Sequence, residues 1–243
     1  MSSLNFNNRP FCGDVISINN VDYVYLNDDN PQQAYDNKDL CFIAQPLKGN
    51  NILYNNIVVP LMMGDMWSII QDEPKLISRL RGSEKKFKYG FIGSCNHAGR
   101  NIFKELKLDD YLFEDNRNQI WNMSDIDKRQ SIIRFLTRLS ECEYVFAPRG
   151  VGSSSFRLYE AMSVGSIPIV TGMIEYPFES RVRWDDMCFR GELRDIELLI
   201  NKCDSTSIGV YNQMRERSMD FWDYYCRHDR LYNKLIDIID DNI

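Results

Sequence analysis

Arg149 and Arg157 flank a turn rich in glycine and serine, and Glu160 lies three residues after the second arginine. Arginine binds phosphate through forked, charge-assisted hydrogen bonds. The turn precedes a predicted helix, so its backbone N–H groups lie at the positive end of the helix dipole, where anions bind. Glu160 is within reach of a ribose diol, as acidic residues are in nucleotide-binding folds. These residues predict a site for a nucleotide or a nucleotide sugar.

Two apolar strands position this turn. Residues 144–147 form the first predicted strand, and residues 167–170 form the second, after the helix. Upstream, residues 88–93 predict another strand that ends in Gly93, followed by a helix at residues 100–106. Strands that alternate with helices are typical of a parallel sheet in an α/β fold. Because ligands of such sheets bind at the carboxyl ends of the strands, we expect both glycine turns at one edge.

The remaining elements suggest two units. The N-terminal part is rich in asparagine and aspartate and contains short strand-like runs at residues 21–26, 40–44 and 56–60. Further helices are predicted at residues 74–81, 126–140, 193–202 and 209–239, with a strand at 187–189. The charged stretch at residues 83–88 is the candidate boundary. The sequence therefore predicts an α/β protein with a reduced N-terminal lobe, residues 1–82, and a Rossmann-like C-terminal lobe, residues 83–243.

Composition argues against several classes of protein. A net charge of −6 is unlike that of a general nucleic-acid binder, which carries a basic excess. The seven cysteines show no CxxC spacing, which argues against a disulfide framework and a zinc site and favours free thiols in a reducing compartment. The N-terminus lacks the features of a signal peptide, and the chain has no run of about 18 apolar residues. We therefore expect a cytoplasmic protein without a transmembrane segment.

Three groups of motifs together resemble one enzyme family. The first reads PRG at residues 148–150, SFR at 155–157, EA at 160–161 and GSIPIV at 165–170; the second reads EYPFESRVRWDDM at 175–187; the third reads FIGSCNHAGRNIF at 91–103. Each motif alone is weakly specific, whereas the spaced combination is specific. Over roughly residues 87–222 the chain resembles the exostosin-like glycosyltransferases, which are two-lobed enzymes of the GT-B type.

The resemblance implies inverting, metal-independent transfer of a sugar from a nucleotide-sugar donor, usually a UDP-sugar, to a glycan hydroxyl, with no further cofactor. The donor site would consist of Gly93, Arg100, Arg149, Gly150, Ser154, Ser155, Arg157 and Glu160. The N-terminal lobe, which supplies the acceptor groove in the family, is much shorter here. Asp65 is the first candidate for the base that deprotonates the acceptor, with helix capping as its alternative. His97 is the second candidate, with a solvated loop position as its alternative.

The donor-site residues also have plainer interpretations. Arg149 and Arg157 are compatible with surface ion pairs, and Glu160 is compatible with an i, i+3 pair to Arg157. The serines at 153–155 are suited to capping the helix, which uses the same backbone N–H groups as phosphate binding. Gly165 is predicted to end the helix in a left-handed conformation.

Three rival functions remain open from the sequence. A non-catalytic nucleotide-sugar-binding or partner subunit is compatible with the short N-terminal lobe. An epimerase or a dehydrogenase is disfavoured because the first strand of the parallel sheet lacks a following GxGxxG and no YxxxK motif is suitably placed. A purely structural interaction protein would leave the paired arginines and the glycine–serine turn unexplained.

Overall fold

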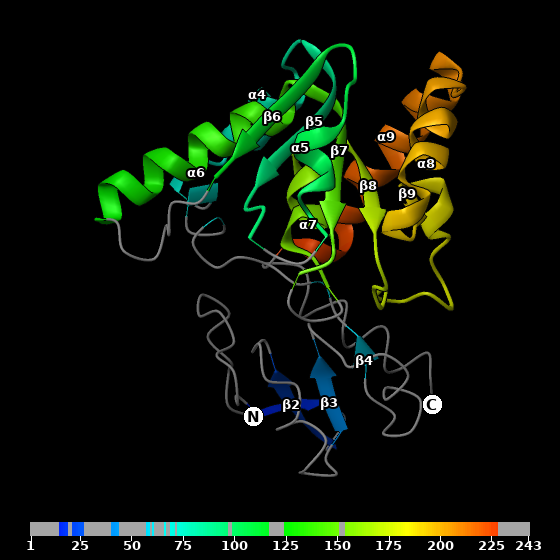
Figure 1. The fold of residues 1–243 in the computed structure, drawn as a ribbon. Coiled ribbons are helices and arrows are strands. Elements are labelled where there is room, and N and C mark those ends of the chain that lie inside the picture. Colours follow the sequence, from blue (N-terminus) through cyan, green and yellow to red (C-terminus); the bar gives the residue numbers. More distant parts are fainter. Residues whose placement is uncertain are drawn as a thin grey trace.

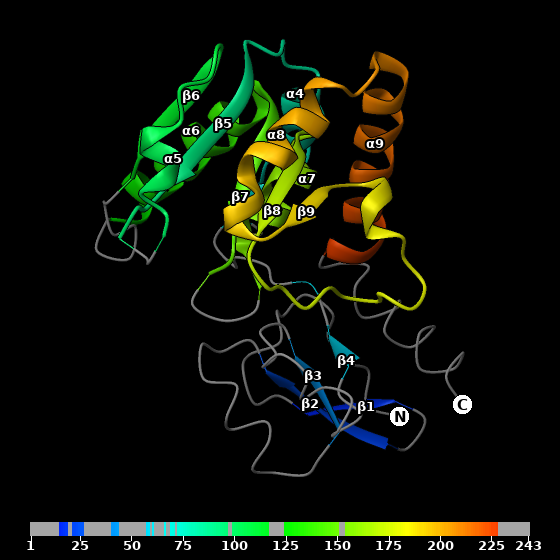
Figure 2. The same ribbon diagram turned by 45° about the vertical axis from the view of Figure 1, so that its right-hand side comes forward.

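The computed structural model of the chain describes most of its C-terminal two thirds and several short N-terminal segments. The described residues are 15–18, 21–26, 40–43, 57–58, 60, 66, 69–70, 72–96, 99–116, 124–150 and 154–227. Two sheets lie within these segments, one of four strands and one of five. Figures 1 and 2 show the four short strands on the side toward which the strands of the larger sheet run.

The smaller sheet has the order β1-β2-β3-β4. Its strands are β1 (Val15–Ile18), β2 (Val21–Leu26), β3 (Leu40–Ile43) and β4 (Ile57–Val58). β1 pairs with β2 in the antiparallel sense, and the other two pairings are parallel. The sequence predicted β2, β3 and β4 but missed β1. Ile18 pairs with Val21, so β1 and β2 form a hairpin with a two-residue connection. The short apolar run of β1 did not by itself predict this hairpin.

The larger sheet has the order β6-β5-β7-β8-β9, and all its pairings are parallel. Its strands are β5 (Phe87–Gly93), β6 (Tyr111–Asp115), β7 (Cys142–Pro148), β8 (Ile167–Thr171) and β9 (Phe189–Gly191). The prediction of an α/β fold with a parallel, Rossmann-like sheet is confirmed. The two-lobed GT-B arrangement stays a prediction.

Helices cover both faces of the larger sheet (Figures 1 and 2). They are α4 (Leu76–Arg81), α5 (Ile102–Glu105), α6 (Asp125–Ser140), α7 (Phe156–Ser163), α8 (Ile196–Asp204) and α9 (Ile208–Phe221). Val145 and Val170 face a core shared with α4, α6 and α7. Tyr144 and Ile169, their neighbours along the strands, face a second core shared with α5 and α8. This alternation buries both faces of the sheet, as a doubly covered parallel sheet requires.

Several predicted elements differ in extent from the observed ones. The helix expected at residues 100–106 is the four-residue α5, and the helix expected from residue 193 begins as a 3₁₀ turn, η3 (Leu193–Asp195), before α8. The long C-terminal helix starts as α9 and continues into a π-helical segment, η4 (Trp222–Cys226). Residues 228–239 of that prediction lie outside the described residues. Short terminal turns depend on tertiary contacts more than on periodicity.

The turn after α7 follows the prediction for Gly165. This residue has φ +71°, its N–H donates to Met162 O, and Ser166 N–H donates to Ala161 O. The two hydrogen bonds form a Schellman motif, in which glycine adopts the left-handed conformation at low cost. Cationic side chains also bind carbonyls at this end of the helix: Arg81 Nε reaches Ser163 O at 2.8 Å, and Lys85 Nζ and Arg215 Nε both reach Gly165 O at 2.9 Å. They complement the negative end of the helix dipole.

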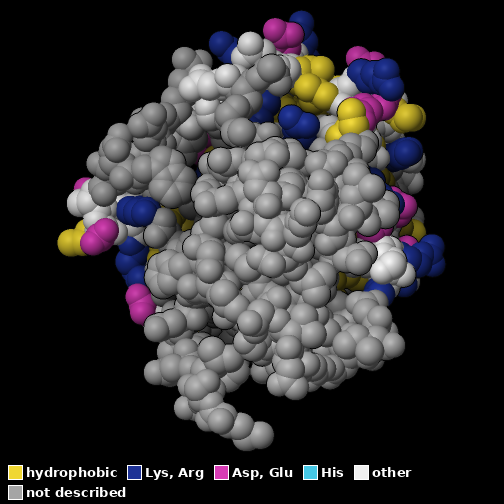
Figure 3. All heavy atoms as spheres, turned by 90° about the horizontal axis from the view of Figure 1, so that it is seen from below, with side chains coloured by type: hydrophobic (Ala, Val, Ile, Leu, Met, Phe, Trp, Pro, Cys, Tyr) yellow, Lys and Arg dark blue, Asp and Glu magenta, His cyan; other side chains and the backbone are white. Residues whose placement is uncertain are grey.

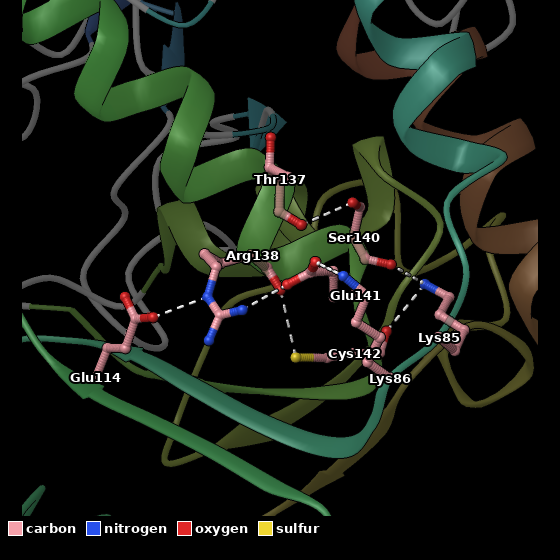
Figure 4. A network of polar contacts seen from close by, with 8 residues as sticks. All are labelled: Lys85, Lys86, Glu114, Thr137, Arg138, Ser140, Glu141 and Cys142. Atoms are coloured by element: carbon pink, nitrogen blue, oxygen red, sulfur yellow. Dashed lines mark hydrogen bonds and ion pairs between the residues drawn. The ribbon is translucent and has the colours of Figure 1, made fainter.

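The stretch at residues 83–88, predicted as a domain boundary, packs against the larger sheet. Lys85 Nζ donates to Ser140 O and Cys142 O, both at 2.9 Å, where α6 passes into β7 (Figure 4). Lys86 pairs with Glu141, which also pairs with Arg138. α4, which precedes this stretch, contributes to the core under α6. The division into residues 1–82 and 83–243 remains a prediction, and α4 itself packs with the C-terminal sheet.

Candidate functional site

The carboxyl ends of β5, β7 and β8 lie side by side and carry the glycine turns. Pro148 at the end of β7 pairs with Thr171 at the end of β8, and β5 ends at Gly93 beside β7. The chain passes from β5 to β6 on one side and then to β7 on the other, so the order reverses between β5 and β7. This reversal is a topological switch point, where open parallel sheets bind their ligands.

Arg100 spans this switch point. Its Nη1 donates to Ser94 O at 3.2 Å, after β5, and its Nη2 donates to Arg149 O at 2.7 Å, after β7. The guanidinium is half-buried. Burial lowers the pKa of Arg100, and the nearby positive charge of Arg157 lowers it further. Arg100 therefore fixes the two loops relative to each other and adds a positive charge between them, a bridging role that sequence reasoning did not foresee.

Arg157 and Glu160 form a partly buried ion pair on α7. Arg157 Nη1 lies 2.9 Å from Glu160 Oε2, and the two side chains are 20% and 6% exposed. The Arg157 guanidinium stacks on the Phe135 ring with Cζ 4.1 Å from the ring centre. A Cβ added to Gly93 would lie 3.5 Å from Arg157 Nη2, so the glycine backbone approaches this guanidinium closely. The sequence had left pairing with Arg157 open for Glu160, and the structure shows that pair.

The electrostatics of this group leave a positive charge uncompensated. Burial raises the pKa of Glu160 and lowers the pKa of Arg157, while their mutual attraction opposes both shifts. Glu160 pairs with Arg157, whereas the hydrogen bonds that Arg100 makes within the described residues go to two carbonyl oxygens. The charge of Arg100 therefore lies near that of Arg157 without a carboxylate partner of its own among those residues. An unpaired charge away from water is costly, so the group favours binding of an additional anion.

The turn between β7 and α7 holds the N-terminus of the helix toward this edge. Gly150 N–H donates to Ser154 O at 2.8 Å, which closes the turn. Ser155 occupies the N-cap position but makes no side-chain cap; its hydroxyl donates to Pro148 O at 3.0 Å. Ser154 is 2% exposed, and its hydroxyl has no hydrogen-bond partner among the described residues. Leu158 N–H donates to Ser155 O at 3.3 Å. Among the described residues, the N–H groups of Phe156 and Arg157 and the Ser154 hydroxyl are therefore the donors left for a ligand at this turn.

Arg149 contributes through its backbone and leaves its side chain in solvent. Its N–H donates to Thr171 O at 2.9 Å, which continues the ladder between β7 and β8 past the strand end. The Arg149 side chain is exposed at the same edge. Phosphate contact by this guanidinium stays a prediction. Figure 3 views the molecule from below, and the described side chains visible around the rim include both Lys or Arg and Asp or Glu.

The structure adds two residues that the sequence interpretation had not included. Thr171 ends β8 with a buried hydroxyl, and Gly172 follows it with φ +93°. A Cβ on Gly172 would lie 3.2 Å from Arg149 Cβ, so the backbone passes close to the loop after β7. The sequence signal for these two residues was a hydroxyl residue followed by glycine directly after an apolar strand. The predicted strand had been ended one residue earlier, at Val170.

The two candidate bases, Asp65 and His97, lie outside the described residues. Their assignment as the group that deprotonates an acceptor stays a prediction. Across the part of the chain that the structure describes, no group of three or more His, Cys, Asp and Glu side chains is arranged to hold a metal ion. Metal independence also stays a prediction.

The loop between β8 and β9 contributes Tyr176, Phe178 and Trp184 to the core that contains α7. Trp184 Nε1 donates to Pro177 O at 2.9 Å, and the indole is 1% exposed. Phe178 has φ +56°, an uncommon conformation for an aromatic residue, and its ring lies 4.7 Å from the Tyr225 ring in η4. The Pro-Phe and Trp segment that resembles the glycosyltransferase motif therefore forms core structure beside the site.

Comparison with known proteins agrees with these motifs. Residues 78–183 match the family described as RXYLT1 C-terminal domain, an exostosin-like, glycosyltransferase-related family. The matched region runs from α4 to the loop after β8 and includes the switch point and α7, but it covers less than half of the 243 residues. No curated protein matches the chain. The match supports a glycosyltransferase-related family at a coarse level. Among the described residues, no helix is long and apolar enough to cross a membrane.

Proposed function

We propose that this protein is a glycosyltransferase that moves a sugar from a nucleotide-sugar donor, a UDP-sugar, to a glycan hydroxyl. The main support is the pair of neighbouring guanidiniums at the switch point: Arg157 pairs with Glu160, whereas Arg100 donates to two carbonyls and has no carboxylate partner among the described residues. A diphosphate would supply the missing negative charge. The family match over residues 78–183 supports sugar transfer over other nucleotide-dependent reactions.

In this proposal the site stabilises the leaving nucleoside diphosphate. Breaking the bond to the sugar leaves a growing negative charge on the diphosphate, which preorganised donors and cations stabilise. Arg157 and the N-terminus of α7 would contact it directly, together with the Ser154 hydroxyl. Arg149 would reach it from solvent. Arg100 already donates to two carbonyls, so it would act mainly by holding the loops and by its charge.

The acceptor side rests on residues that the structure does not describe. An inverting reaction needs a base that removes the proton of the acceptor hydroxyl, and Asp65 and His97 remain the candidates. Glu160 would hold the ribose through the carboxylate oxygen that does not face Arg157. Inversion, independence of metal and the two-lobed GT-B arrangement belong to the same proposal.

UDP binding tests the donor site. UDP should raise the melting temperature of the wild-type protein, with a dissociation constant measurable by calorimetry. Arg149→Ala should weaken UDP binding roughly tenfold, the scale of one hydrogen bond to a charged group, and should leave the melting temperature of the free protein unchanged. Arg79→Ala is the matched control, because its side chain is 66% exposed and lies on α4, away from the strand ends. If UDP, ADP and GDP all leave the wild type unchanged, the donor-site proposal is wrong.

Turnover separates the enzyme from the non-catalytic alternative. Many glycosyltransferases slowly hydrolyse their own donor, so the purified chain should release UDP from at least one UDP-sugar in a screen that also contains GDP- and dTDP-sugars. Release of nucleotide that is lost in Asp65→Asn or in His97→Gln would assign the base. Tight UDP binding without turnover on any donor or acceptor would instead favour a binding or partner subunit.

A further inference from the structure

Thr171 carries a buried hydroxyl that the fold leaves without a partner. It is 2% exposed, and its Oγ1 makes no hydrogen bond within the described part of the chain. Burying a hydroxyl without a partner costs free energy, and native proteins seldom do so without a reason. Ser154 shows the same property at the adjacent turn. Both residues lie at the carboxyl edge of the sheet.

The strand pattern shows which face of the sheet Thr171 occupies. Ile167 and Ile169 belong to the core shared with α5 and α8. Because side chains two residues apart lie on the same face of a strand, Thr171 faces the α5 and α8 side. The loop that carries Arg100 covers this face as well: a Cβ on Gly99 would lie 2.7 Å from Leu193 Cδ2, next to α8. Thr171 and Arg100 therefore reach the edge from the same side.

The order of the strands then relates Thr171 to the charged group. Arg100 and Arg157 lie at the switch point between β5 and β7, and Thr171 ends β8, the next strand after β7. α7, whose N-terminus would hold the diphosphate, packs on the opposite face of the sheet, with Val145 and Val170. Thr171 therefore lies across the edge of the sheet from α7, on the strand that pairs with β7. A ligand that begins at the N-terminus of α7 and continues past the strand ends would present its nucleoside to Thr171.

We propose that Thr171 binds the uncharged nucleoside part of the ligand whose diphosphate is held at Arg157 and the N-terminus of α7. This inference rests on the proposed function, because it assumes a nucleoside diphosphate at the switch point. A threonine hydroxyl both donates and accepts, which suits the ribose hydroxyls or the polar edge of a base. The hydroxyl selects against ligands that place an apolar group there, since its burial is compensated only by a polar partner.

An unpartnered hydroxyl alone would not support this inference, because other residues share that property. Ser218 is fully buried on α9, and its hydroxyl also has no partner among the described residues. Its neighbour Met219 lies against Gly165, at the end of α7 remote from the strand ends. Ser218 therefore serves as the matched control: it has the same buried, unpartnered hydroxyl but lies away from the site.

The test compares Thr171→Val with Ser218→Ala, and UDP with inorganic pyrophosphate as ligands. Each substitution removes a buried hydroxyl, so the melting temperature of each free variant should equal or exceed that of the wild type. Thr171→Val should weaken UDP binding roughly 3- to 10-fold, the scale of one neutral hydrogen bond, and leave pyrophosphate binding unchanged. Thr171→Ser should keep the wild-type affinity for UDP. Ser218→Ala should change neither affinity.

Each outcome decides between distinct failures. Unchanged UDP affinity in Thr171→Val, or an equal loss for UDP and pyrophosphate, overturns the role of Thr171 while the donor site stands. A melting temperature several degrees lower in Thr171→Val shows that the hydroxyl is structural and also overturns it. A wild type that binds pyrophosphate but no nucleotide limits the site to anions and rejects the inference. A wild type that binds neither ligand rejects the proposed function itself.

Discussion

Lys85 offers the sharpest test of how the sheet is held to its helices. Its ammonium group reaches three carbonyl oxygens, those of Ser140, Cys142 and Gly165, each at 2.9 Å. Gly165 O also accepts from Arg215 Nε, and Cys142 O lies 2.7 Å from the Ser166 hydroxyl. Removal of Lys85 therefore deprives mainly Ser140 O of its side-chain donor. One buried carbonyl without a donor costs about 1–3 kcal/mol, and we expect Lys85→Met to destabilise the fold by that amount.

The neighbouring Lys86 provides the control in the same segment. Lys86 pairs with Glu141, and its side chain is 55% exposed (Figure 4). Exposed pairs contribute between about 0 and 1 kcal/mol, so Lys86→Met should have a smaller effect than Lys85→Met. Urea denaturation followed by circular dichroism measures both free energies of unfolding. Equal effects of the two substitutions would show that the carbonyl contacts of Lys85 contribute no more than a surface pair.

The same residue predicts a pH dependence with a definite sign. Burial, and then the charge of Arg215, lowers the pKa of Lys85 from 10.5 to about 7. Between these values the unfolded chain keeps a proton that the folded chain releases, so the contribution of Lys85 to stability rises with pH. Release of one proton gives the free energy of unfolding a slope of at most about 1.4 kcal/mol per pH unit. The carbonyl acceptors favour the ammonium form of Lys85 and therefore make this slope smaller.

Unfolding measurements from pH 6 to 9 on the wild type and Lys85→Met isolate this dependence, because all other groups titrate in both proteins. The stability of the wild type relative to Lys85→Met should increase toward pH 9. A difference that is flat or falls with pH would refute the reasoning.

Three further substitutions test the packing around the site. Arg157→Met should destabilise the fold by about 3–5 kcal/mol in urea denaturation, because it leaves Glu160 buried without its partner. The double variant Arg157→Met, Glu160→Met should recover much of this loss, and no recovery would contradict the pairing. Gly165→Ala should lower stability by about 1 kcal/mol or more, since φ is +71°, and an unchanged melting temperature would argue against the left-handed turn. Gly90→Ala should destabilise the fold by about 1–3 kcal/mol, because the new Cβ collides with Cys142 Sγ. Adding Cys142→Gly should restore stability in the double variant, whereas additive losses from the two substitutions would reject the contact.

The parts of the fold that follow from local pattern were predictable. Apolar runs predicted β5, β7 and β8, and a glycine after α7 predicted its left-handed end. The glycine–serine turn also predicted where the N-terminus of a helix would meet the strand ends. These features depend on residues close together in the chain, whose preferences act in the same direction as the fold.

The parts that failed or were missed depend on contacts between distant segments. The role of Arg100 arises from a carbonyl 49 positions later, and Lys85 contacts residues 55 to 81 positions away. The charged stretch at residues 83–88 predicted a domain boundary, whereas the fold places the Lys85 ammonium group among carbonyls. Thr171 became a candidate only when its burial and its missing partner were visible. Sequence periodicity carries no information on which buried hydroxyl is satisfied.

The two ends of α7 explain why cations far from the strand edge matter to the site. Three cationic side chains bind the carbonyls at the C-terminus of α7: Arg81, Lys85 and Arg215. At the other end of the helix, Arg157 and the backbone N–H groups of the first turn face the switch point. An eight-residue helix is about 12 Å long and nearly rigid, so its C-terminal anchors fix where its N-terminus lies. Loss of one anchor leaves two others, so Lys85→Met should lower stability much more than it lowers UDP affinity. A large loss of affinity with little loss of stability would mean that the helix shifts as a unit, and that its position depends on Lys85 more than on the combined anchors.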